Sequence, residues 1–114
     1  MKLLDDVPLR EEDRLAIEEA VTLLRRRFPV REVVLFGSKS RGDDDPESDI
    51  DLLVLTTRPL LRAERGAIVD ALFPIQLRHD VVLSPLIVAA EEWESGVVSV
   101  LPIHAEIEED GALV

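Results

Sequence analysis

Two aspartates stand one residue apart where a polar stretch runs into an apolar one. Asp49 and Asp51 lie at the start of SDIDLLVL, residues 48–55. Because side chains at i and i+2 of a strand point to the same face, the two carboxylates would share a face, with Cα atoms about 6.5–7 Å apart. Ionised carboxylates repel each other in a half-buried place, and divalent cations relieve that repulsion. The pair therefore indicates magnesium or manganese, although a solvated acidic turn gives the same pattern.

A third carboxylate, Asp80, interrupts the apolar segment IQLRHDVVL, residues 75–83, which we expect to be a strand. If this strand lies beside 48–55, Asp80 completes a three-carboxylate site for two metal ions. A salt bridge to Arg78 or to another arginine is the alternative, because a lone carboxylate in a buried strand needs a partner.

The turn GSKSRG, residues 37–42, directly follows an expected strand at 31–36. Gly37 has no Cβ, so a phosphate can approach its backbone closely. Ser38 can cap a short helix whose amides point at that phosphate, and Lys39 or Arg41 adds positive charge. An ordinary strand-to-helix turn with a capping serine is the competing interpretation.

Three other motifs for binding phosphate or metal do not fit this region. Gly37 and Gly42 have the spacing of a P-loop, but Asp43 and Asp44 occupy the positions of its lysine and its serine or threonine. The dinucleotide fingerprint GxGxxG is absent. The acidic stretch lacks the glycine and the final glutamate of a calcium loop.

The pattern of apolar and breaking residues predicts one domain over residues 1–114 with an α/β (α+β) fold. Residues 1–9 are expected to be a flexible arm. Periodicity and turn residues predict helices at 10–28, 59–72, 85–94 and 102–109, strands at 31–36, 48–55 and 75–83, a loop at 42–47, and a short final strand in ALV. This order predicts a small mixed β-sheet with helices packed mainly on one face.

Composition narrows the class of protein. With 114 residues, 46% of them apolar, the chain can bury a core, and the absence of cysteine excludes disulfides and thiolate chemistry. A formal net charge of −11 argues against general nucleic-acid binding and suits a basic protein partner. No apolar run approaches a membrane span and no signal peptide opens the chain, so we expect a cytoplasmic protein.

Taken together, Phe36-Gly37-Ser38, the ten-residue spacer, Asp49-Ile50-Asp51 and the later Asp80 resemble the DNA polymerase β-type nucleotidyltransferase superfamily. The resemblance covers residues 10–83, and the stretch 92–114 is similar to the tail of the minimal nucleotidyltransferase (MNT) members. It implies the nucleotidyltransferase fold and a Mg²⁺-dependent transfer of a nucleoside monophosphate, AMP from ATP, to a hydroxyl.

The resemblance also implies a role for each matched residue. Asp49, Asp51 and Asp80 would hold two magnesium ions, and Asp80 would activate the acceptor hydroxyl. The β and γ phosphates would be held by Gly37 and Ser38, with Arg41 and, less directly, Lys39 beside them.

Minimal members that resemble this chain pair with a helical protein of the HEPN class, as antitoxin to a toxin ribonuclease, and some transfer AMP to a tyrosine of that partner. The resemblance therefore implies a HEPN-type partner. Two alternatives stay open: a non-catalytic antitoxin that neutralises its partner by binding, and a stand-alone homodimer that acts on a small acceptor.

Overall fold

The computed structural model describes residues 1–43 and 45–114, so Asp44, in the predicted loop 42–47, lies outside the described residues. The elements, in chain order, are β1 (Lys2–Leu3), a 3-10 turn (Leu4–Asp6), α1 (Glu11–Arg27), β2 (Val30–Phe36), β3 (Ile50–Thr56), α2 (Arg62–His79), β4 (Leu83–Ala89), α3 (Ala90–Ser95), a 3-10 turn (Val97–Val100), α4 (Pro102–Asp110) and β5 (Ala112–Leu113).

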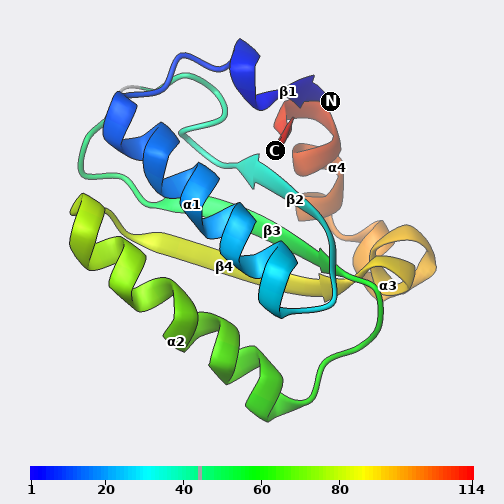
Figure 1. Cartoon of the computed structure of the whole chain (residues 1–114). Helices are drawn as coiled ribbons and strands as arrows, with labels where there is room; N and C mark the ends of the chain where they lie inside the picture. Colours follow the sequence, from blue (N-terminus) through cyan, green and yellow to red (C-terminus); the bar gives the residue numbers. More distant parts are fainter. Residues whose placement is uncertain (44) are drawn as a thin grey trace.

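The strands of the described chain form one mixed sheet in the order β1-β5-β2-β3-β4. Strand β2 pairs antiparallel with β3, and β3 pairs parallel with β4. The two long helices, α1 and α2, lie side by side on one face, and the shorter α3 and α4 lie beside the other (Figure 1). The prediction of a small mixed sheet with helices mainly on one face is confirmed.

Alternation along the central strands builds an apolar layer on each face of the sheet. Leu52 and Val54 of β3 pack toward α1 and α2, whereas Leu53 and Leu55 pack with Trp93 toward α3 and α4. This alternation follows from the two-residue period of a strand. Both faces of β3 are therefore buried along most of its length.

The segment from residue 72 to residue 90 differs from the prediction. The strand expected at 75–83 is wrong, because α2 continues to His79. Ile68, Leu72 and Ile75 recur at helical spacing and are all buried, which holds this segment as a helix. Pro74 lies inside α2 and did not end it.

The helix expected at 85–94 is also wrong at its start. Ser84 and Pro85 belong to strand β4, and α3 begins only at Ala90. Strand β4 is at the edge of the sheet. Pro85 is tolerated there because an edge strand can direct a residue that has no N–H group toward solvent.

The two chain ends are tied to the sheet. Strand β1 pairs parallel with β5, and Leu4 and Val7 are buried in the core, so the N-terminal segment is not the flexible arm we expected. The predicted strand in the last residues is confirmed as β5, which also pairs with β2. No helix in the described part of the chain combines the length and the apolar character that a membrane crossing requires.

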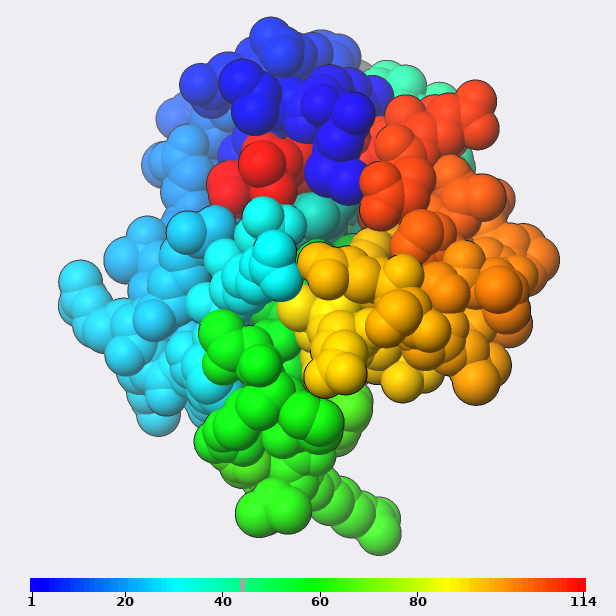
Figure 2. All heavy atoms as spheres, turned by 90° about the vertical axis from the view of Figure 1, so that its right-hand side faces the viewer, coloured from blue at the N-terminus to red at the C-terminus, as the bar shows by residue number. Residues whose placement is uncertain are grey.

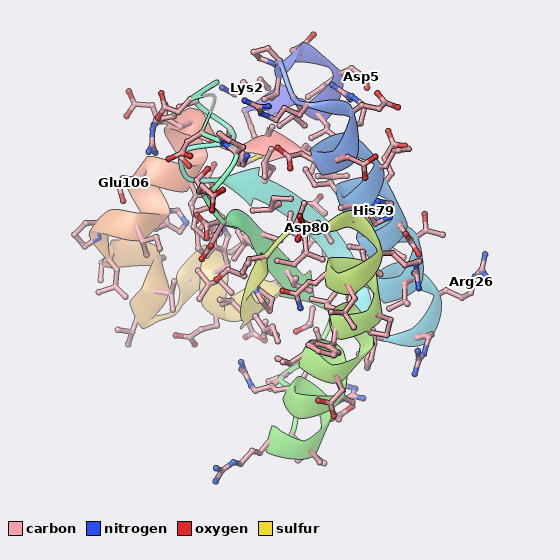
Figure 3. All side chains as sticks on the ribbon, turned by 90° about the vertical axis from the view of Figure 1, so that its left-hand side faces the viewer. Lys2, Asp5, Arg26, His79, Asp80 and Glu106 are labelled. Atoms are coloured by element: carbon pink, nitrogen blue, oxygen red, sulfur yellow. The ribbon has the colours of Figure 1, made fainter. Side chains whose placement is uncertain are left out.

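His79, near the end of α2, connects this helix to α1. Its Nδ1 lies 3.1 Å from a Glu12 carboxylate oxygen and its Nε2 lies 2.7 Å from one of Glu19, and Arg78 also pairs with Glu19. Figure 3 shows His79 directed at α1. The hydrogen bond to Glu19, followed by the one to Glu12, raises the pKa of His79, and His79 together with Arg78 lowers the pKa of Glu19.

His79→Gln should therefore destabilise the protein in a pH-dependent way. Because the pKa of His79 is raised by folding, its contribution is fully present below the usual value of 6.5 and is lost as pH rises through the raised value. The contribution of Glu19 is lost as pH falls through its lowered pKa. Urea midpoints should differ between wild type and variant near about pH 5.5 and converge near about pH 9. His104→Gln is the matched control. A difference between wild type and His79→Gln that does not change with pH would contradict a stabilising charge pairing of His79 with Glu12 and Glu19.

Candidate functional site

The glycine-serine turn lies at the end of β2, beside the start of β3. The Arg41 amide donates to the Ser38 carbonyl at 3.2 Å, and the Asp43 amide donates to the same carbonyl at 3.1 Å. The buried Ser40 hydroxyl donates to the Gly37 carbonyl at 2.9 Å. The described backbone here forms hydrogen-bonded turns, so the short helix that Ser38 was expected to cap is not formed.

Gly37 meets two requirements that only glycine satisfies together. Its φ is +76°, in the left-handed region that favours glycine. A Cβ at this position would collide with the carboxylate of Asp51. The absence of a side chain therefore brings the Asp51 carboxylate against the backbone of the turn.

The two aspartates sit at the start of β3 in different environments. Asp49 is exposed just before the strand, and Asp51 is half-buried within it, paired across the sheet with Phe36. Burial, and next the charge of Asp49, raises the pKa of Asp51, while Arg41 opposes both effects. The repulsion inferred from the sequence is therefore present, and a bound cation would relieve it.

Asp80 does not lie where the sequence analysis placed it. It caps the C-terminal end of α2 in the left-handed conformation, with φ 53°, and is exposed (Figure 3). It lines a cleft of about 320 Å³ that also includes Glu47 and Ser48. Among the described residues, no three His, Cys, Asp or Glu side chains group closely enough to hold a metal ion. The expected three-carboxylate cluster is thus not formed, because α2 carries Asp80 at its end and β4 begins later.

The residue of β4 that pairs with Asp51 is Ser84. Directly paired residues of neighbouring strands project to the same face, so Ser84 lies beside Asp51 on the face that α3 and α4 partly cover. Ser84 is not among the predicted site residues, because a serine followed by proline is also typical of a helix start. A strand that continued back through Pro85 to Leu83 would have placed Ser84 beside Asp51.

Helix α4 also borders the site. A cavity of about 140 Å³ lies between the glycine turn and α4, lined by Phe36, Gly37, Arg41, Ile103, Glu106, Ile107 and Asp110. Figure 3 shows Glu106 well away from the α2 end that carries Asp80. Sequence reasoning gave no signal for this contact, because it joins segments about 65 residues apart.

The two cations of the turn have different environments. Lys39 is buried, with 3% of its side chain exposed, and its Nζ lies 2.8 Å from the Asp13 carboxylate and 2.9 Å from the Asp45 carbonyl. It is therefore directed at α1 rather than at solvent. Arg41 is exposed, 3.8 Å from the Asp43 carboxylate.

These positions together allow phosphate and metal chemistry. Mg²⁺ in proteins is typically held by one or two carboxylates together with substrate phosphates and water. Asp49 and Asp51 supply two carboxylates next to the glycine turn, and the Asp51 carboxylate fills the space that Gly37 leaves by having no Cβ. The residues present fit a magnesium ion that is bound together with a phosphate ligand.

Comparison with known proteins gives a consistent picture. The nucleotidyltransferase domain family matches residues 17–108. Two relatives from Methanocaldococcus jannaschii, each named "Putative protein adenylyltransferase", are 40% identical over 55 residues and 30% identical over 78 residues. The matches span 48% and 67% of this chain, and 56% and 73% of the relatives.

Solved structures share the fold at lower identity. A toxin-antitoxin complex with AMP-PNP contains a chain that is 21% identical, with a TM-score of 0.60 over 91% of this chain and 72% of that one. A Shewanella oneidensis complex of a tri-AMPylated HEPN toxin with an MNT antitoxin matches with 20% identity and a TM-score of 0.55, over 88% of this chain and 69% of that one. The family match covers most of the sequence, and the chain belongs to the nucleotidyltransferase domain family, a family of enzymes.

Proposed function

We propose that this chain is a Mg²⁺-dependent nucleotidyltransferase that transfers AMP from ATP to a hydroxyl of a HEPN-type partner and thereby acts as an antitoxin. The observation that carries the proposal is the contact of the Asp51 side chain with the backbone of the Gly37 turn. That contact places a carboxylate against the turn to which the family resemblance assigns the phosphates. The names of the relatives, and of solved complexes with the same fold, agree with this chemistry.

In this proposal Asp49 and Asp51 hold the magnesium. Held by these two carboxylates, the metal would supply positive charge that stabilises the negative charge developing during phosphoryl transfer. The two carboxylates and the phosphates together would supply the ligands for the two ions expected from the family. Asp80 is not a metal ligand in this proposal, because it caps the end of α2 and does not cluster with Asp49 and Asp51.

The turn supplies the phosphate contacts. Gly37 allows close approach of the β and γ phosphates, Ser38 can donate from its hydroxyl, and Arg41 is exposed beside them. Lys39 lies on the buried side of the turn. Its Nζ donates to the Asp13 carboxylate of α1 and to the Asp45 carbonyl of the following loop. Lys39 is thus a positioning residue rather than a direct phosphate ligand.

The reaction is an in-line displacement. The acceptor oxygen attacks the α-phosphorus, the bond from this phosphorus to the β-phosphate oxygen breaks, and pyrophosphate leaves. The hydroxyl proton passes to solvent. Ser84, beside Asp51, is neutral at physiological pH and is placed to hydrogen-bond an entering acceptor rather than to act as its base.

The structural neighbours and the net charge support a HEPN-type partner in this proposal. Solved complexes with this fold contain HEPN toxins, one of them AMPylated. A chain with a formal charge of −11 favours a basic partner. A cytoplasmic setting, where ATP and magnesium are available, agrees with this role.

A second function is favoured by one observation. Because Ser84, and not a carboxylate, pairs with Asp51, the site has no third acid there, and slow or absent turnover is compatible with it. In that case the chain would bind nucleotide and neutralise its partner by complex formation alone.

Asp49→Asn with Asp51→Asn separates the two functions. We expect the double variant to lose transfer of radiolabelled AMP to the partner, because the magnesium ligands are gone. We also expect it to be at least as stable as the metal-free wild type, since burial and repulsion raise the pKa of Asp51. Mg-ATP should raise the melting temperature of the wild type only.

The matched control is Glu47→Gln with Asp80→Asn, which removes the same charge from the neighbouring cleft. We expect this control to keep transfer. Loss of transfer in the control would return Asp80 to the active site. Full neutralisation of the toxin by the Asn double variant would favour the non-catalytic function.

The buried Lys39–Asp13 pair allows the effect of Lys39 on the free energy of unfolding to be separated from its effect on the KM for ATP. Lys39→Met leaves a buried Asp13 unpaired and should cost about 3–5 kcal/mol in the free energy of unfolding. Adding Asp13→Leu should recover most of that loss. The double variant still lacks the bond to the Asp45 carbonyl, so its KM for ATP should stay raised. A wild-type KM in the double variant would limit Lys39 to a role in stability.

Gly37→Ala tests the close approach of Asp51. Alanine at φ +76° should cost about 1–2 kcal/mol in unfolding and displace the carboxylate, so that Mg-ATP binding measured by calorimetry is lost. Gly42→Ala is the matched control, because Gly42 has φ +79° but its added Cβ would meet only Pro8, at 3.5 Å. Equal effects on binding in the two variants would contradict the prediction.

A further inference from the structure

Helix α2 carries an exposed row of large apolar side chains. Val69, Phe73 and Leu77 follow one another at intervals of four residues, and 51%, 57% and 68% of these residues are exposed. Residues four apart on a helix lie on the same face, so the three form a continuous ridge. We call it the α2 ridge.

The ridge is additional to the face that α2 buries. Ile68, Leu72 and Ile75 already pack into the core against the sheet and α1. A helix that is apolar on both its inner and outer sides is typical of one that is covered on both. Contiguous exposed apolar surface of this kind marks an interaction site.

Gly66, one turn before the ridge, gives a second and independent indication. Glycine lowers helix stability relative to alanine. Gly66 has no positive φ, and no described atom lies within 4 Å of a Cβ built there, so nothing within the described chain requires glycine. A small residue at an exposed helix surface lets another chain approach closely.

The ridge lies between two grooves. One, of about 470 Å³, separates α2 from the edge strand β4 and includes Gly66, Val69 and Pro85. The other, of about 430 Å³, separates α2 from α1 and includes Ala67, Pro74 and Arg78. A ridge beside grooves on the same surface is self-complementary, which is what a two-fold interface between identical chains requires.

Charge selects a second copy as the occupant. The whole chain has a formal charge of −11, so most of its surface repels an identical chain. Helix α2 instead carries three arginines, Arg62, Arg65 and Arg78, against two acids, Glu64 and Asp70. It is therefore a surface on which two copies can meet without net acidic repulsion. Figure 2 shows the start of α2, in green, projecting at the lower edge of the molecule.

We propose that the chain forms a homodimer in which the α2 ridge of one copy packs against the ridge and grooves of the other across a two-fold axis. This dimer leaves the site open. Asp51 pairs with Phe36, which packs toward α3 and α4, on the face of the sheet opposite α2. The inference is independent of the proposed transfer reaction.

Sedimentation equilibrium of the purified full chain tests the dimer. We expect a dimer in the wild type, and at least a tenfold weaker association for Phe73→Glu and for Leu77→Glu. Val100→Glu is the matched control, because Val100 is 81% exposed but lies outside α2, and its association should equal that of the wild type. Circular dichroism confirms that each variant is folded.

Gly66→Gln adds a readout that a folding defect would not give. Placed in the monomeric Phe73→Glu background, it should raise the melting temperature, because glutamine is a better helix former than glycine. Placed alone, it should weaken association, because its side chain fills the groove.

Three outcomes overturn the proposal. A wild type that is monomeric at all soluble concentrations excludes the dimer. A dimer that Phe73→Glu and Leu77→Glu leave intact excludes this face. A wild-type chain that stays monomeric alone but binds an added helical protein through Phe73 assigns the ridge to that partner instead.

Discussion

The site depends on the contact between the Asp51 carboxylate and the backbone of Gly37, where a Cβ cannot fit. Two features of the fold bring the groups together. The register of β2 and β3 pairs Asp51 with Phe36, and the chain then turns back at Gly37. A one-residue slip would move every side chain of β3 to the opposite face. Such a slip would bury the Asp51 carboxylate in the core beneath α1 and α2, where Ile50 and Leu52 now pack, so the core disfavours it and holds Asp51 on the other face.

The site region contains one pair of opposite charges, Lys39 and Asp13, and one pair of like charges, Asp49 and Asp51. The buried Lys39–Asp13 pair, with 3% and 8% of the side chains exposed, has its charges matched at 2.8 Å and stabilises the turn from behind. Burial and then the charge of Asp49 raise the pKa of Asp51, and the exposed Arg41 opposes them without cancelling them. Functional sites commonly keep such unfavourable charge where a ligand later relieves it. The buried Lys39–Asp13 pair thus holds in place a turn that lies beside two carboxylates that repel each other.

The sequence predicted those elements whose signals are local. Helix α1, strands β2 and β3, and helix α4 follow from periodicity and from breaking residues such as Pro29 and Gly111. The wrongly predicted strand and helix start lie between Pro74 and Pro85, where each proline has a tertiary explanation: one lies inside a helix held by its buried side, and the other is on an edge strand. Asp80 was misplaced for this reason, and Ser84 was overlooked. The partner of Lys39 is 26 residues away, and no local pattern identifies it.

The position of β4 at the edge of the sheet connects the site with the rest of the surface. Ser84 pairs with Asp51 on one side, and in the described chain no further strand pairs on the other. Arg65 of α2 donates to the Ile87 carbonyl at 2.9 Å and thus occupies part of the same edge further along the strand. Gln76 of α2 accepts a hydrogen bond from the Leu83 amide at 3.0 Å, so side chains of α2 contact this edge near both ends of β4. Helix α2 thus supplies hydrogen-bond partners to backbone groups that an edge strand would otherwise leave unpaired, while Ser84 lies on the sheet face that carries Asp51.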